Sequence, residues 1–400
     1  MPLHSGKVPR WLYERMEKIG FAITELIIRE YGTEGFLSRL SNPYWFQALG
    51  CVMGMDWHSS GITTSVMGSL KRAVNKHSQD LGLYICGGRG NLSRKTPLEL
   101  ADISRQFGIE SNPLIRASRL SAKIDNTCLD DGFQLYLHCF ILDRESHWAV
   151  VQQGMNKETK TARRYHWHAA EIASFVDNPQ SAIIGSPKGI IVNMVDHRSS
   201  DSRNAVVSFM HEHPDRQVKE LQALGFPVKR KLQLELFMPE HHDIRSSDLD
   251  AGRLGAILAT AYEHQVTGFE EALLIPGVGP RTVQSLALVS EIVYGTPNRF
   301  SDPARFSFAH GGKDGHPFPV PIKTYDESIS LLRTAIDHAK VGQKDRVDCI
   351  RRLHLFTKEI EQHCQPYADV QAAIDHEKRL SSSLGGRTCF SHQSVSSNVR

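Results

Sequence analysis

Acidic and polar residues flank two predicted strands in the first half of the chain. The apolar run 133–142 and the run 148–153 are joined by a short polar turn, which predicts a β-hairpin. Carboxylates at the ends of adjacent strands can share Mg²⁺ or Mn²⁺, and such an ion orients a water for phosphodiester cleavage. This interpretation assigns Asp125, Asp131 and Asp143 as metal ligands and places Asp131, Asp143, His138 and Gln153 in a catalytic centre.

The same residues also have a purely structural interpretation. Asp131-Gly132 is typical of a turn, and Asp143 of the corner of a hairpin. Metal-dependent nucleases with this strand order carry a lysine after an acidic pair on the second strand. Gln152 and Gln153 occupy that place here, so the metal site is one of two hypotheses for this hairpin.

A second set of residues with defined chemistry lies between positions 268 and 294. An amphipathic stretch ends at Ile275, the turn Pro276-Gly277-Val278-Gly279 follows, and Pro280 takes the first position of a new helix. The start of a helix offers N–H groups and the positive end of its dipole to an anion such as a DNA phosphate. The predicted DNA contacts of this segment are Gly277, Val278, Gly279, Arg281 and Thr282.

This segment resembles the helix-hairpin-helix motif of DNA repair proteins, whose hallmark is a Pro-Gly-Val-Gly hairpin. In DNA glycosylases with that motif, a catalytic lysine lies in the second helix and an aspartate follows it. The resemblance places Arg281 at the lysine and Asp302 near the aspartate, and an arginine does not readily deprotonate for lyase chemistry. Asp302 is equally well interpreted as a cap or turn residue, and an ordinary helix–turn–helix connection is the alternative for the hairpin.

Two segments of the first half carry clustered cations. The glycine-rich run 86–97 is interpreted as a phosphate-binding loop or as the solvated start of a helix at Thr96-Pro97. The run 160–168 alternates cations with aromatic rings, which suits stacking on nucleic acid but is also typical of a buried aromatic cluster with a basic rim. The predicted nucleic-acid contacts are Arg89, Arg94 and Lys95 in the first run and Arg163, Arg164, Tyr165 and Trp167 in the second.

Longer stretches of the chain resemble a prokaryotic family known as domain of unknown function 763. The resemblance extends from the start to about residue 365 and brings no established reaction. The stretches that carry it include Trp45-Phe46-Gln47-Ala48-Leu49-Gly50-Cys51, Asp56-Trp57-His58-Ser59-Ser60-Gly61, Asp131-Gly132-Phe133-Gln134-Leu135-Tyr136, Val151-Gln152-Gln153-Gly154-Met155-Asn156 and Ala162-Arg163-Arg164-Tyr165-His166-Trp167.

The elements that position these residues change character along the chain. Apolar spacing of three and four predicts a helix over 10–31, with Gly32 as its C-cap. Strands are expected in the hairpin and at 181–185 and 189–195. Helical patterns occupy 66–79 and 97–107, and from position 202 they follow one another over 202–223, 246–265, 268–274, 280–294, 324–340 and 344–363.

The predicted fold class is therefore α+β. We expect a mixed domain over 1–200, a linker or helical connection over 201–245 and an all-α domain with the helix-hairpin-helix over 246–365. The Ser- and Gly-rich end, 381–400, is expected to be a disordered tail.

Composition constrains the compartment and the partners. The 400 residues carry 47 Lys and Arg against 44 Asp and Glu, which excludes a histone-like polycation but allows nucleic-acid binding through local patches. The seven cysteines form no CxxC pair, and neither a signal peptide nor a long apolar run is present. We expect a cytoplasmic protein that does not enter a membrane.

Three functions agree with these observations. The first is a DNA-processing nuclease that uses Mg²⁺ or Mn²⁺ in the first domain and holds DNA with the hairpin. The second is a DNA-binding repair accessory protein without catalysis. The third is a DNA glycosylase that works at the hairpin and Asp302.

Overall fold

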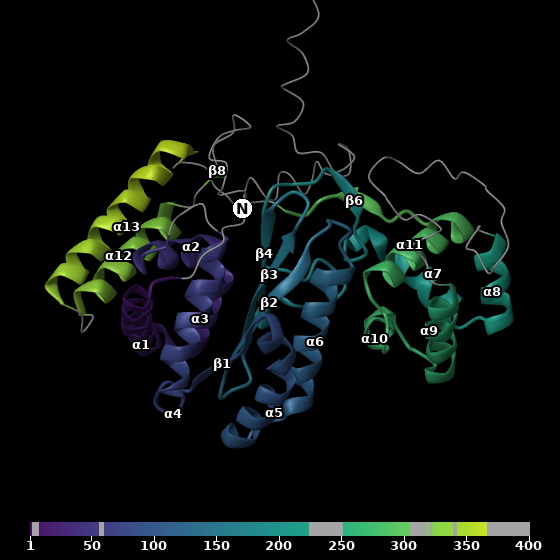
Figure 1. Ribbon diagram of the computed structural model, residues 1–400, viewed down its shortest axis with the longest axis horizontal. Helices are drawn as coiled ribbons and strands as arrows, with labels where there is room; N and C mark the ends of the chain where they lie inside the picture. Colours follow the sequence, from purple (N-terminus) through teal and green to yellow (C-terminus); the bar gives the residue numbers. More distant parts are fainter. Residues whose placement is uncertain are drawn as a thin grey trace, which may run out of the picture.

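A five-stranded antiparallel sheet forms the centre of the protein (Figure 1). The computed structural model describes residues 1, 8–55, 60–223, 251–304, 318–319, 322–338 and 342–365. The strands follow one another in space in chain order: β1 (Leu83–Arg89), β2 (Gln134–Asp143), β3 (Trp148–Asn156), β4 (Thr161–His168) and β5 (Ala182–Ile184).

One face of the sheet is covered by helices from both ends of the chain. Figure 1 shows them on the left: α1 (Arg10–Ser41), α2 (Pro43–Val52), α3 (Gly61–Asn75), α12 (Ile322–His338) and α13 (Gln343–His363). On β2, Leu137, Cys139 and Ile141 point into this core, because alternate residues of a strand face the same side.

The opposite face is covered by α5 (Thr96–Phe107) and α6 (Ser111–Thr127), with further helices beyond them. Phe140 and Leu142 of β2 point into this second core. The remaining helices of this side are α7 (Ser200–Met210), α8 (Pro214–Ala223), α9 (Ala251–His264), α10 (Phe269–Leu274) and α11 (Pro280–Tyr294).

Short elements connect these layers. The helix α4 (Ser78–Leu81) precedes β1, and 3₁₀ turns occupy η1 (Gly90–Lys95), η2 (Ala169–Glu171) and η3 (His197–Ser199). Two small pairings complete the described secondary structure: β6 (Ile190–Val192) with β7 (Arg299–Ser301), and β8 (Phe318–Pro319) with β9 (Cys364–Gln365).

The mixed α+β class and most of the predicted elements are confirmed. The helix predicted over 10–31 continues to Ser41, because Gly32 (φ 74°, ψ 176°) kinks the helix instead of ending it. The basic run 160–168 is a strand, β4, and α6 was not expected at all.

The helical second half divides between the two faces of the sheet. Residues of α7 and α9–α11 share a core with α5 and α6, whereas α12 and α13 share a core with α1–α3. The helices expected over 246–365 therefore complete the two cores of the sheet. Within the expected linker 201–245 the structure describes α7 and α8 up to residue 223, and the expected tail 381–400 lies outside the described residues.

Candidate functional site

Arg163 of β4 lies at the centre of a buried ionic cluster. Its guanidinium donates to Asp131 Oδ2 at 2.7 Å and to both oxygens of Asp302 at 3.0 and 2.6 Å, and the side chains of all three residues are fully buried. Tyr165 adds a hydroxyl bond to Asp131 at 3.0 Å. Burial alone would lower the pKa of Arg163, but the two carboxylates outweigh it and the net shift is upward.

Both carboxylate oxygens of Asp302 are occupied by protein donors. Besides Arg163, Oδ2 accepts the Lys188 N–H at 2.8 Å and Oδ1 accepts the Ala304 N–H at 3.0 Å. This arrangement orders the chain that follows β7 and agrees with the turn interpretation of Asp302.

Asp125 of α6 is a second buried carboxyl on the same face of the sheet, and it faces only neutral donors. Oδ2 accepts from Gln152 Nε2 at 2.6 Å and from Trp167 Nε1 at 2.8 Å, while Oδ1 accepts from Gln180 Nε2 at 2.8 Å. Burial raises the pKa of Asp125 to about 8, and these hydrogen bonds offset only part of that effect.

His138 extends this network towards α6. Its Nδ1 lies 2.8 Å from Gln152 Oε1 and its Nε2 lies 2.8 Å from Ser118 Oγ. Because Gln152 Nε2 is bound to Asp125, Oε1 must accept, so Nδ1 carries the proton and Nε2 accepts from Ser118. Burial lowers the pKa of His138 to about 4, which keeps the imidazole neutral near pH 7.

Arg164 points to the opposite face of the sheet, where it is also fully buried. Its partners are neutral: His166 Nε2 at 2.9 Å, Gln47 Oε1 at 3.1 Å and Thr63 Oγ1 at 3.5 Å. No described carboxylate forms an ion pair with it, and burial lowers the pKa of Arg164 to about 9.

The predicted metal ligands do not converge. Asp143 ends β2, whereas Asp131 precedes the start of that strand and binds Arg163 and Tyr165 of β4. Asp143 accepts from Thr33 Oγ1 at 2.7 Å and from His147 and the turn amides, as expected for a hairpin corner. In the described part of the chain no three His, Cys, Asp or Glu side chains are grouped to hold a metal ion.

Gln153, the fourth residue of the predicted catalytic centre, lies on the other face of the sheet from His138. It is fully buried and donates to Ser60 O at 3.0 Å and to the Tyr136 hydroxyl. Asp131 and His138 thus lie on one face in neighbouring hydrogen-bonded groups, Gln153 lies on the other face, and Asp143 occupies the hairpin corner. Alternation along the strands explains why Gln153 and His138 face opposite cores.

The nucleic-acid contacts predicted in β4 are incorrect. Arg163, Arg164, Tyr165 and Trp167 are completely buried, since β4 lies between β3 and β5 with helices on both faces. The alternation of cations and rings therefore reflects a buried strand whose polar groups are bound within the protein.

The basic residues of the glycine-rich run, in contrast, are exposed. Arg89, Arg94 and Lys95 lie at the end of β1 and in η1, in front of α5. The preceding Gly87 (φ +83°) packs so closely on β2 that a Cβ atom would lie 2.3 Å from the His138 carbonyl oxygen. The close packing of Gly87 thus fixes the start of the glycine-rich loop, while the cations that follow it are exposed to solvent.

The hairpin predicted from Pro-Gly-Val-Gly joins α10 to α11. Gly277 has φ +91°, Val278 is buried, and Pro280 is the first residue of α11. Thr282 is mostly buried, and its Oγ1 accepts from the Gly279 N–H at 3.5 Å, while Arg281 is exposed. The turn therefore presents glycine backbone and the N-terminus of a 15-residue helix at the surface.

Helix α6 supports this turn with cationic side chains. Arg116 forms an ion pair with Glu270 of α10 at 2.8 Å, and Lys123 donates to the Val278 carbonyl. Arg119 is exposed between them on the same stretch of α6. Helix α6 was not predicted as part of this site, although its cations, spaced by three and four residues, were a signal for it.

One family model matches most of the chain. The model described as "Protein of unknown function (DUF763)" matches residues 1–320, which include the complete sheet and the α10–α11 turn. The chain belongs to this family. DUF763 carries no assigned reaction, and no curated protein and no solved structure matches this member. Among its described helices, none combines the length and apolar character needed to span a membrane.

Proposed function

We propose that this DUF763 protein binds DNA through the α10–α11 turn and the adjacent cationic edge of α6. The observation that carries the proposal is the turn at the start of α11, in which Gly277 is exposed and Gly279 is partly exposed, with Arg119, Lys123 and Arg281 around it. The first turn of a helix has N–H groups without intrahelical acceptors, and these N–H groups attract phosphate. The resemblance to the helix-hairpin-helix motif supports the same interpretation.

The contacts of α6 explain how the turn would be held in position for DNA. The Arg116–Glu270 ion pair fixes α10 against α6, and Lys123 binds the carbonyl of Val278 within the turn itself. Arg119 is left to contact a second phosphate. The cations of the glycine-rich loop, Arg89, Arg94 and Lys95, are the further predicted contacts that remain accessible.

Binding without cleavage is the form of this function that the geometry supports best. Asp143 lies apart at the hairpin corner, and the oxygens of Asp125 and Asp131 accept from protein donors, which favours a structural role over a shared Mg²⁺ or Mn²⁺. Asp302 is held by Arg163 and two backbone amides, which gives the glycosylase hypothesis no base or nucleophile. We therefore favour a DNA-binding accessory factor over a nuclease.

The substitution Gly279→Val tests the turn directly. Gly279 has φ −143°, which any residue adopts, and a Cβ atom there meets only the Gly277 oxygen at 3.9 Å. The side chain should therefore be tolerated by the fold but should obstruct the approach of a phosphate. We expect the affinity for a fluorescent duplex to fall at least tenfold by anisotropy.

Gly268→Val is the matched control. Gly268 precedes α10, has extended backbone (φ −168°) and has no atom within 4 Å of its Cβ position. It should leave the affinity unchanged. Equal affinities for wild type, Gly279→Val and Gly268→Val would refute the role of the turn.

The role of α6 is tested by the salt dependence of binding. Each lost phosphate contact reduces the slope of log K against log salt by about 0.9 on duplex DNA. We expect this change for Arg119→Gln. Arg29→Gln serves as control because Arg29 is an exposed arginine on α1, at the opposite face of the sheet. Identical slopes for both variants would exclude Arg119 as a contact.

A further inference from the structure

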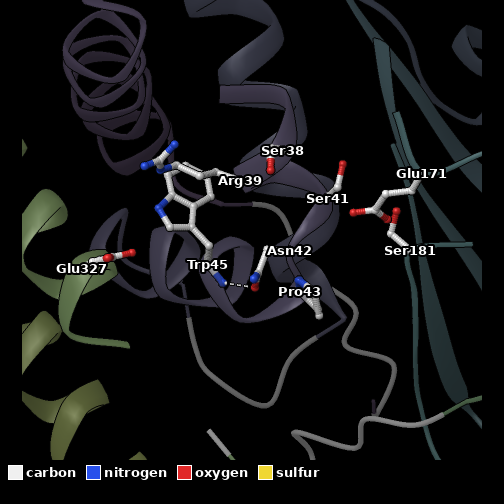
Figure 2. Close-up of a pocket in the computed structure, with 9 residues that line it drawn as sticks. All are labelled: Ser38, Arg39, Ser41, Asn42, Pro43, Trp45, Glu171, Ser181 and Glu327. Atoms are coloured by element: carbon white, nitrogen blue, oxygen red, sulfur yellow. Dashed lines mark hydrogen bonds between the residues drawn. The ribbon is translucent and has the colours of Figure 1, made fainter. Parts of the chain in front are cut away.

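A cavity of about 370 Å³ lies on the other side of the sheet from the proposed DNA contact (Figure 2). It is formed where α1 ends and α2 begins, with α12 and the segment from η2 to β5 as its remaining walls. Its lining is polar and consists of Ser38, Arg39, Ser41, Asn42, Pro43, Trp45, Glu171, Ser181 and Glu327.

Two buried polar groups of this lining have no hydrogen-bond partner in the described part of the chain. They are the indole N–H of Trp45, a residue that is 1% exposed, and the hydroxyl of Ser181. A buried donor without an acceptor costs about 1–3 kcal/mol, so such groups are expected to have a partner in the functional state. Both groups line the same cavity, which indicates that the partner binds there.

The charged groups of the cavity are distributed between its two ends. Figure 2 shows Arg39 and Glu327 on one side of Trp45, and Glu171 with Ser181 on the other. Arg39 donates to the Gly35 carbonyl at 2.8 Å and stacks on the ring of Tyr31, which leaves further N–H groups of its guanidinium for a ligand.

The two glutamates give the cavity an excess of negative charge. Neither Glu171 nor Glu327 forms an ion pair with a described residue, whereas Arg39 supplies the one positive charge of the lining. A ligand that complements these groups carries cations at both ends and one anion near Arg39.

We propose that this cavity binds a basic α-amino acid. Its α-carboxylate would accept from Arg39 and from the Trp45 indole, and its α-ammonium would bind Glu327. Its cationic side chain would bind Glu171 and the Ser181 hydroxyl. The volume lies within the range of small-molecule sites, and the net charge of the ligand matches the excess negative charge of the lining.

Titration calorimetry with the full chain tests the proposal, with L-arginine as the probe. We expect binding of L-arginine and at least tenfold weaker binding of agmatine, which lacks the carboxylate, and of L-citrulline, whose side chain is neutral. No heat with millimolar L-arginine and L-lysine would overturn the proposal. Equal binding of agmatine and L-arginine would overturn the assignment of Arg39 and Trp45.

Single substitutions test the proposed contacts with L-arginine one at a time. Trp45→Phe keeps an aromatic side chain but removes the indole N–H, and Glu171→Gln removes the charge at the other end. Each substitution should weaken L-arginine binding at least fivefold. Glu145→Gln, on an exposed glutamate of the β2–β3 turn, is the control and should bind as wild type. Unchanged binding in both Trp45→Phe and Glu171→Gln would refute the site, with circular dichroism showing that each variant is folded.

This proposal is independent of DNA binding. Gly279→Val should bind L-arginine as wild type does, whatever its effect on DNA. Trp45→Phe should in turn bind DNA as wild type does. Loss of both ligands in both variants would contradict the independence of the two sites.

Discussion

Arg163 and Asp302 are 139 residues apart in the sequence and form a two-point ion pair with fully buried side chains. Asp131 binds the same guanidinium from the segment before β2. The cluster therefore joins the middle of the sheet to the chain that leaves β7. It holds the chain after β7 against this face of the sheet.

Replacing Arg163 should be severely destabilising. Arg163→Met leaves Asp131 and Asp302 buried without a cation, and breaking a buried ionic cluster in this way costs about 3–5 kcal/mol. Urea denaturation should show this loss in the free energy of unfolding. Arg105→Met is the control, because the ion pair of Arg105 with Asp102 is largely exposed and should contribute less than about 1 kcal/mol. A loss below 1 kcal/mol for Arg163→Met would contradict the structural role.

Asp125 should make the protein less stable as the pH rises. Its pKa is raised from 3.8 to about 8 by burial, so between about pH 4 and pH 8 the unfolded chain has lost a proton that the folded protein keeps. The free energy of unfolding then falls with rising pH, by at most about 1.4 kcal/mol per pH unit from this group.

Asp125→Asn removes that ionisation, and Gln180 can rotate its amide to accept from the new NH₂ group. Relative to wild type, the stability of the variant should increase between pH 5 and pH 8, measured by urea denaturation. The exposed Asp102→Asn should show a constant difference. A constant difference for Asp125→Asn as well would show that the carboxyl is ionised throughout.

His138 should have the opposite effect on the pH dependence of stability, because it should make the protein more stable as the pH rises. Burial lowers its pKa from 6.5 to about 4, so in that interval the unfolded chain binds a proton that the folded protein does not. Its contribution to stability is complete above about pH 6.5 and is lost as the pH falls towards 4. In an NMR titration the imidazole signals of His138 should not move between pH 7 and pH 5. A midpoint near 6.5 would contradict the buried, neutral imidazole.

Gly87 and Gly90 form a matched pair for the glycine-rich loop. Both have positive φ, but a Cβ at Gly87 would lie 2.3 Å from the His138 carbonyl oxygen, whereas nothing lies within 4 Å of that position at Gly90. Gly90→Ala should cost about 1 kcal/mol for the backbone conformation alone. Gly87→Ala should cost about 2 kcal/mol more because the strands must separate. Equal thermal midpoints for the two variants would show that β1 tolerates the side chain.

Periodicity in the sequence was sufficient to predict the class and most elements of this protein. The β2–β3 hairpin and the helices α3, α5 and α9–α13 follow from spacings of two and of three to four, which depend on local geometry. The turn at Gly277 was also predictable, because positive φ next to a helix start has a local signature in glycine and proline.

The position of the polar residues was decided by the tertiary structure. The sequence of β4 is typical of a basic surface segment, yet Arg163 and Arg164 are buried. Asp131 and Asp302 bind Arg163 on one face, and Gln47 and Thr63 bind Arg164 on the other, all from distant parts of the chain. Asp131 and Asp143 are candidate ligands of one metal ion in the sequence, but Asp131 lies before the start of β2 and Asp143 is its last residue. The cavity beside Trp45 combines residues of α1, α2, α12 and the segment around η2. Such long-range pairings depend on how the helices cover the sheet, and a single sequence holds no local signal for them.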